Sequence, residues 1–190
     1  MHDRTRQLEV IVGCMFSGKT SELLRRLERV ILSGRKILLF KPSIDDRYRK
    51  DAVVTHFGRE FPAVLLDRGE ETMEVLEKLV GKEAIEEATV VAFDEGNFFS
   101  DKLINLCQEL VAKGKRVIVA GLDLTSNEEP FVPMPTLVCL ADSLVKLDAV
   151  CVVCGGVATR SQRIAESRER IYVGGKQDYE ARCRSCYEKP

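Results

Sequence analysis

The pattern with the most specific chemistry lies near the N-terminus. An apolar segment, Leu8 to Val12, is followed by the octapeptide GCMFSGKT at positions 13–20, which matches the phosphate-loop pattern G-x-x-x-x-G-K-[ST]. Glycines at positions 13 and 18 let the backbone curl so that successive N–H groups and the start of the next helix face an anion. Lys19 would span the β- and γ-phosphates of a nucleotide, and the Thr20 hydroxyl would ligate Mg²⁺. The sequence therefore predicts a nucleoside triphosphate site.

Two adjacent carboxylates, Asp94 and Glu95, follow the apolar segment at positions 90–93. A phosphate loop needs an acid on the magnesium side at the end of a neighbouring strand, and we assign that role to Asp94. Adjacent residues at a strand end point in different directions, so Glu95 is free to face a substrate hydroxyl or a water as a general base. The alternative is that both acids only cap a loop.

Four of the seven cysteines form two C-x-x-C pairs in the last 40 residues. Each pair has the spacing that brings two thiolates to one tetrahedral Zn²⁺, and four thiolates leave no open position, so this pattern predicts a structural zinc site. The ligands would be Cys151, Cys154, Cys183 and Cys186. The other three cysteines have no partner at metal spacing, and we expect them to be small buried hydrophobes. These are Cys14, Cys107 and Cys139.

Hydrophobic periodicity indicates the elements that must position these groups. Strand-like and helix-like segments alternate along the first 150 residues, which predicts an α/β fold: a P-loop NTPase-like, mostly parallel sheet with helices on both faces and ligands at the carboxyl ends of its strands. Expected strands are 8–12, 36–40, 89–93, 116–120 and 144–150, and expected helices begin near residues 20, 73, 103 and 137. A polar segment at 42–62 is too long for a simple connector.

Composition and charge narrow the function. With 29 basic and 30 acidic side chains the net charge is −1, which argues against general binding to nucleic acid or to an anionic membrane. The N-terminal apolar run is too short for a signal peptide, and we expect a cytoplasmic protein. We expect two domains: residues 1–149, an ATP-binding α/β domain, and residues 150–190, a small zinc module with a loop that covers the substrate.

An ordered set of segments resembles the cytosolic, zinc-containing (type II) thymidine kinase family. The resemblance runs from about Val10 to Tyr187 and is far more specific than a phosphate loop alone. Its segments are the phosphate loop with Met15-Phe16, Lys41-Pro42, Asp45-Asp46-Arg47-Tyr48, Asp94 to Phe99, Gly121-Leu122-Asp123, Pro130-Phe131, Leu140 to Ser143, and Tyr172 to Gly175 before Tyr179 and the last cysteine pair.

The resemblance implies transfer of the ATP γ-phosphate to the 5′-hydroxyl of thymidine, giving dTMP for nucleotide salvage and DNA synthesis. It implies Glu95 as the base, Thr20 and Asp94 on Mg²⁺, ATP as co-substrate, one structural Zn²⁺ per chain and a homotetramer. The phosphate-binding residues would be Gly13, Met15, Phe16, Ser17, Gly18, Lys19, Thr20, Asp45 and Arg47. The thymidine-binding residues would be Met15, Phe98, Leu122, Ser161, Tyr172, Val173, Gly174 and Tyr179. Use of deoxyuridine and feedback inhibition by dTTP stay open.

Three positions depart from the family pattern. Asn97 stands where glutamine is usual, Ser126 where an aromatic residue is common, and Ser161 where threonine is common. Asn97 is one methylene shorter than glutamine, which puts the positioning of the loop beside Glu95 in doubt. These changes leave the reaction class unaltered.

Two other classes of protein share parts of the pattern. A motor-type or recombination ATPase would also place a glutamate near water, but it needs a basic DNA-binding surface, which the net charge of −1 disfavours. A zinc-ribbon nucleic-acid binder would use the arginine-rich last 40 residues, where only three tyrosines are available for base stacking.

Overall fold

The computed structural model describes residues 6–44, 52–54, 60–166, 174–175 and 177–189. Its centre is a six-stranded parallel sheet in the order β5-β2-β6-β7-β1-β8. These strands are β1 (Gln7–Gly13), β2 (Ile37–Pro42), β5 (Val64–Leu66), β6 (Val90–Phe93), β7 (Arg116–Gly121) and β8 (Ser143–Leu147). The predicted mostly parallel α/β fold is confirmed.

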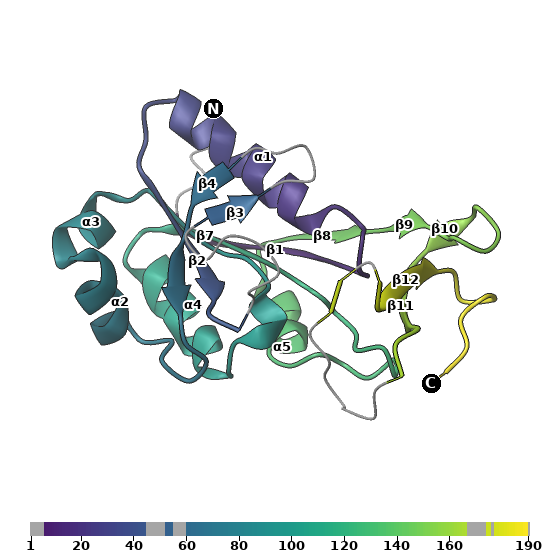
Figure 1. Cartoon of the computed structure of the whole chain (residues 1–190). Helices are drawn as coiled ribbons and strands as arrows, with labels where there is room; N and C mark the ends of the chain where they lie inside the picture. The colour runs from purple at the N-terminus through teal and green to yellow at the C-terminus, as the bar shows by residue number, and fades with distance from the viewer. Residues whose placement is uncertain (1–5, 45–51, 55–59, 167–173, 176, 190) are drawn as a thin grey trace.

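Helices cover both faces of this sheet, as Figure 1 shows. Successive side chains of a strand point to opposite faces of the sheet. Ile11 packs with the helix on one face, whereas Val10 and Val12 pack with the helices on the other. The helices are α1 (Lys19–Leu32), α2 (Met73–Val80), α3 (Lys82–Glu87), α4 (Lys102–Ala112) and α5 (Met134–Leu140), and a 3-10 turn, η1, spans Gly96–Phe98. Helix α1 covers one face, and α2 to α5 supply the apolar residues on the other.

Helix α1 follows the phosphate loop directly and is amphipathic. Its buried residues are Leu23, Leu24, Leu27 and Val30, which pack on Ile11 and the neighbouring strands. The helix ends at Leu32 with Ser33 as its C-cap, and Gly34 takes the left-handed conformation (φ 75°) that commonly follows a helix end. The longest helix of the described chain has 14 residues, and none there combines the length and hydropathy of a membrane span.

Small antiparallel ribbons form the C-terminal part. They are β9 (Ala149–Val150) with β10 (Val157–Ala158), and β11 (Arg160–Arg163) with β12 (Tyr179–Arg182). In Figure 1 they lie beyond the end of β8, away from α2 and α3. A third ribbon, β3 (Ala52–Val54) with β4 (Glu60–Pro62), occupies part of the predicted polar connector.

Two predictions about local structure were wrong. The expected strand at 144–150 is divided, because β8 pairs with β1 only as far as Leu147 and β9 then pairs with β10. Cys139 is exposed rather than buried. Helix α5 buries Met134 and Leu137, and Cys139 lies two residues beyond Leu137, about 200° around the helix axis, so it faces outward.

Candidate functional site

The phosphate loop connects the buried strand β1 to α1, as predicted. Gly13 lies so close to the end of β8 that an added Cβ would be 2.4 Å from the Leu147 carbonyl oxygen. Gly18 has φ 83°, a left-handed conformation that favours glycine, and immediately precedes the helix. The two glycines are therefore required by the backbone path, and the free N–H groups at the start of α1 suit an anion.

Lys19 and Ser17 both hydrogen-bond to the carbonyl oxygen of Cys14 within the loop. The Lys19 Nζ donates at 2.8 Å and the Ser17 Oγ at 2.8 Å. Burial lowers the pKa of Lys19, and the carboxylates of Glu95 and Asp94 oppose this effect. The ammonium group is thus held among groups of opposite charge at the base of the loop, where phosphates would add further favourable charge.

Thr20 meets Asp94 across the carboxyl edge of the sheet. Its Oγ1 donates to the Asp94 carboxylate, at 3.0 Å from Oδ2 and 3.2 Å from Oδ1, and Asp94 is only 5% exposed. The strand that carries Asp94 is not adjacent to β1, because β7 lies between them. The expectation of a neighbouring strand was wrong, but the two side chains still meet. A hydroxyl and a carboxylate together are the hard oxygen ligands that fit Mg²⁺.

Glu95 occupies a tight turn directly after Asp94. It is half-buried and left-handed (φ 49°, ψ 43°), and its N–H donates to Asp94 Oδ1 at 3.0 Å. The following Gly96 is confined, since an added Cβ would lie 2.6 Å from Val119 Cγ1 and 2.9 Å from Met134 Sδ. Such a conformation persists in a non-glycine residue only when its surroundings impose it. The fold thus holds Glu95 in a fixed position beside Asp94.

Asn97, the residue before Phe98, connects the η1 turn to Leu122. The Leu122 N–H donates to Asn97 Oδ1 at 2.8 Å. The buried Phe98 ring packs edge-on against Phe131, with ring centroids 5.9 Å apart and an interplanar angle of 85°. The η1 turn is therefore joined to the segment after β7, which places two of the predicted thymidine-binding residues in one structural unit.

Met15 and Ser161 form a second connected pair. The Met15 N–H donates to Ser161 Oγ at 2.9 Å. Ser161 pairs with Ala181, and Tyr179 lies two residues before Ala181 in β12, so Ser161 and Tyr179 share one face of the ribbon. Gly174 is buried. A single pocket that joins this group to Phe98 and Leu122 stays a prediction. Four predicted site residues lie outside the described part: Asp45, Arg47, Tyr172 and Val173.

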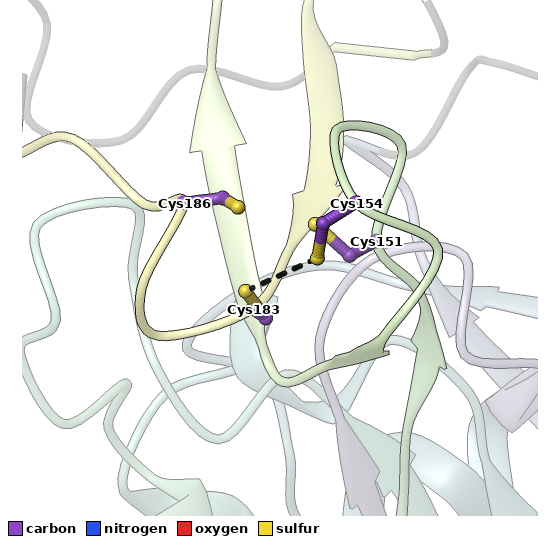
Figure 2. A group of neighbouring side chains, drawn as sticks. All are labelled: Cys151, Cys154, Cys183 and Cys186. Carbon is purple, nitrogen blue, oxygen red and sulfur yellow. Dashed lines mark hydrogen bonds between the residues drawn. The ribbon is translucent and has the colours of Figure 1, made fainter.

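The four predicted zinc ligands converge, as Figure 2 shows. Their Sγ atoms all lie within 4.8 Å of one another, and Cys154 and Cys183 Sγ are 3.7 Å apart. Tetrahedral coordination at a Zn–S distance of about 2.3 Å requires sulfurs about 3.8 Å apart. Each pair lies on a turn, closed by Gly155 N–H to Cys151 oxygen (2.8 Å) and Cys186 N–H to Cys183 oxygen (3.2 Å). All four thiols are free of disulfides, and the site fits Zn²⁺.

Sequence reasoning missed Glu71. This buried carboxylate (1% exposed) accepts hydrogen bonds from Ser100 N–H at 2.7 Å, from Ser100 Oγ and from Gly69 N–H. It anchors the chain that leaves the Glu95 turn. No local pattern marks it, because an acid just before an N-cap threonine is ordinary for the start of a helix such as α2.

These features define the class: an α/β protein of the P-loop type that also carries a four-cysteine cluster suited to a metal ion. The family model for thymidine kinase matches residues 6–187. A thymidine kinase of Coprothermobacter proteolyticus is 45% identical over 96% of this chain and 91% of its own, and one of Halobacterium salinarum is 42% identical over 95% and 93%. A crystal structure of a DNA replication initiation factor is similar with a TM-score of 0.44 and 14% identity, covering 74% of this chain and 40% of that one.

The chain belongs to the thymidine kinase family. The match covers both the six-stranded sheet and the ribbons that carry the cysteines.

Proposed function

We propose that this protein transfers the γ-phosphate of ATP to the 5′-hydroxyl of thymidine, giving dTMP in nucleotide salvage. Membership of the thymidine kinase family supports this reaction. The structural observation that best supports the proposed reaction is the hydrogen bond from Thr20 to Asp94, which brings the end of the phosphate loop to the Asp94-Glu95 turn. A phosphate-binding element and a carboxylate for a substrate hydroxyl are thereby neighbours.

The phosphate loop binds the donor. Its N–H groups and Lys19 contact the β- and γ-phosphates, and the residues involved are Gly13, Met15, Phe16, Ser17, Gly18, Lys19 and Thr20, with Asp45 and Arg47 from the following connector. Thr20 and Asp94 hold Mg²⁺, whose charge, when it is bound, offsets the negative charge on the phosphates. The half-buried Lys19 donates one N–H to the Cys14 carbonyl, and its other two N–H donors would contact phosphate oxygens.

Glu95 is the general base for the acceptor. Its carboxylate orients the 5′-hydroxyl and accepts its proton as that oxygen attacks the γ-phosphorus. The left-handed turn supports this role, because it ties the Glu95 backbone to the Asp94 carboxylate and so keeps Glu95 beside the phosphate loop. The thymine ring lies among Met15, Phe98, Leu122 and Tyr179, with Ser161, Tyr172, Val173 and Gly174 completing the pocket.

The zinc module is the second part of the enzyme. We assign residues 1–149 to the ATP-binding domain and residues 150–190 to the module, in which Cys151, Cys154, Cys183 and Cys186 hold one structural Zn²⁺. The family resemblance further supports a cytoplasmic homotetramer. We also propose dTTP, the end product of the pathway, as a feedback inhibitor, and deoxyuridine as a second acceptor.

Incubation with γ-labelled ATP, Mg²⁺ and a panel of nucleosides tests the proposal, with and without DNA. We expect labelled dTMP from thymidine, independent of DNA. DNA-stimulated ATP hydrolysis without a labelled nucleotide product would overturn it in favour of a DNA-dependent ATPase. DNA binding without ATP turnover would indicate a zinc-ribbon nucleic-acid binder.

A further inference from the structure

One peptide unit of the phosphate loop, that between Cys14 and Met15, is held at both ends. Its N–H, on Met15, donates to Ser161 Oγ at 2.9 Å. Its carbonyl, on Cys14, accepts from Lys19 Nζ at 2.8 Å and from Ser17 Oγ at 2.8 Å. Because a peptide unit is planar, the direction of its N–H fixes the direction of its carbonyl. The Ser161 hydroxyl therefore determines where the Cys14 carbonyl holds the Lys19 ammonium group.

Ser161 reaches the loop from a distant part of the chain. It lies 146 residues from Met15, on β11, and is 6% exposed. A second contact runs alongside the first, since Cys14 Sγ donates to the Ala158 carbonyl oxygen at 3.3 Å. Cys14 also packs in a small apolar cluster with Cys151, Ala158 and Ala181. The ribbon and the phosphate loop thus share a buried interface, and the Ser161 hydrogen bond is part of it.

We propose that Ser161 is a positioning residue for the phosphate donor, acting through the Cys14–Met15 peptide on Lys19. This rests on the proposed function, in which Lys19 binds the ATP phosphates. Without the hydroxyl, the Met15 N–H loses its acceptor at a part-buried position, and the loop relieves this loss by rotating the peptide. Rotation moves the Cys14 carbonyl and releases Lys19 from the place in which it meets the phosphates.

The β11–β12 ribbon therefore contributes to binding of the phosphate donor as well as to the proposed thymine pocket. Ser161 shares a ribbon face with Tyr179, a residue of the proposed thymine pocket. A single hydroxyl then connects the two substrate sites, which distinguishes this role from a thymine contact made by Ser161 alone.

The test compares Ser161→Ala with Ser161→Thr in the full-length, zinc-containing protein, without any nucleoside. Isothermal titration measures the affinity for a non-hydrolysable ATP analogue with Mg²⁺. We expect Ser161→Ala to bind it roughly tenfold more weakly, as for loss of one acceptor that leaves a part-buried N–H unpaired. Ser161→Thr keeps the hydroxyl and should stay within about twofold of the parent, since the hydrogen bond is retained.

Gln162→Ala is the matched control. Gln162 is the next residue of β11, is 5% exposed, and accepts from Glu188 N–H at 2.8 Å, so its loss weakens the ribbon without touching the phosphate loop. We expect its analogue affinity to equal that of the parent. Equal weakening in Gln162→Ala and Ser161→Ala, or unchanged affinity in Ser161→Ala, would overturn the proposal. Because no nucleoside is present, these outcomes are independent of whether thymidine is the acceptor.

Discussion

Glu9 supports a stability prediction whose size follows from its contacts. The side chain is fully buried on β1, between α1 and β7. Its carboxylate pairs with Arg26 Nη1 at 2.6 Å and with Arg116 at 2.7 and 2.9 Å, and Gln7 Nε2 donates to it at 2.7 Å. Glu9→Gln keeps the shape but removes the charge, so Arg116 loses this buried counter-ion, whereas Arg26 keeps its pair with Glu22 at 2.8 Å.

The expected cost follows from how exposed those arginines are. Loss of one partner of a buried ion pair costs about 3–5 kcal/mol in free energy of unfolding. The Arg26 and Arg116 side chains keep 11% and 13% exposure, so water relieves part of the penalty and we expect about 3 kcal/mol. For a chain of this length, at about 2–4 °C per kcal/mol, the melting midpoint should fall by about 6–12 °C.

Thermal unfolding followed by circular dichroism at several pH values measures this. Burial raises the pKa of Glu9, but its hydrogen bonds and charge pairing with Arg116 and Arg26 outweigh burial and hold the pKa below its ordinary value of 4.5. The stabilisation is therefore complete above pH 4.5 and is lost as the pH falls through the folded-state pKa.

The matched control is Glu74→Gln on α2, where Glu74 pairs with Lys78 on the exposed surface. We expect no measurable change in its midpoint, because exposed pairs contribute little. If Glu9→Gln at neutral pH melts within about 2 °C of the parent, or if the difference between them persists at acid pH, the ion-pair reasoning is refuted.

Three further predictions concern the site. Lys19→Ala should abolish labelled dTMP formation and leave the melting midpoint unchanged. Near-normal turnover would contradict the assignment of the loop at 13–20 to the ATP phosphates. Glu95→Gln should reduce kcat by about 10² while thymidine affinity is preserved. This reduction is at the lower end of the range for a general base, because a loose phosphoryl-transfer transition state depends little on proton removal. Elemental analysis should find about one zinc per chain, and chelation should lower the melting midpoint. The zinc prediction would be contradicted by a protein that contains no zinc and has disulfides among Cys151, Cys154, Cys183 and Cys186.

Local patterns predicted β1, β2, β6, β7 and β8 of the sheet and helices α1, α2, α4 and α5, and missed β5, α3 and the small ribbons. The segment at 90–93 and the spacing of Leu23 and Leu27 each encode an element through neighbours in sequence, and both were confirmed. Strand order is different in kind, because it depends on how the crossover connections pack. Nothing in the apolar segments of β1, β6 and β7 indicates that β7 inserts between the other two.

The parts of the site that depend on remote contacts were also beyond sequence reasoning. Glu71 holds Ser100 from 29 residues away, and Ser161 holds Met15 from 146 residues away. Each acceptor belongs to a residue type that is common on protein surfaces. Only burial distinguishes them, and burial follows from the packing of whole elements rather than from spacing.

Asn97 illustrates how a sequence departure becomes interpretable in the fold. Because Asn97 is one methylene shorter than glutamine, the sequence alone did not establish how the loop beside Glu95 is positioned. In the fold, Asn97 is fully buried and its Oδ1 accepts from Leu122 N–H at 2.8 Å. Its Nδ2 is the buried side-chain nitrogen that finds no partner among the described residues. An added Cβ on Gly121 would lie 3.0 Å from Asn97 Oδ1, so the backbone approaches the short side chain closely. The carbonyl end of the amide therefore joins the turn to Leu122, and the extra methylene of glutamine would move the whole amide within this close packing.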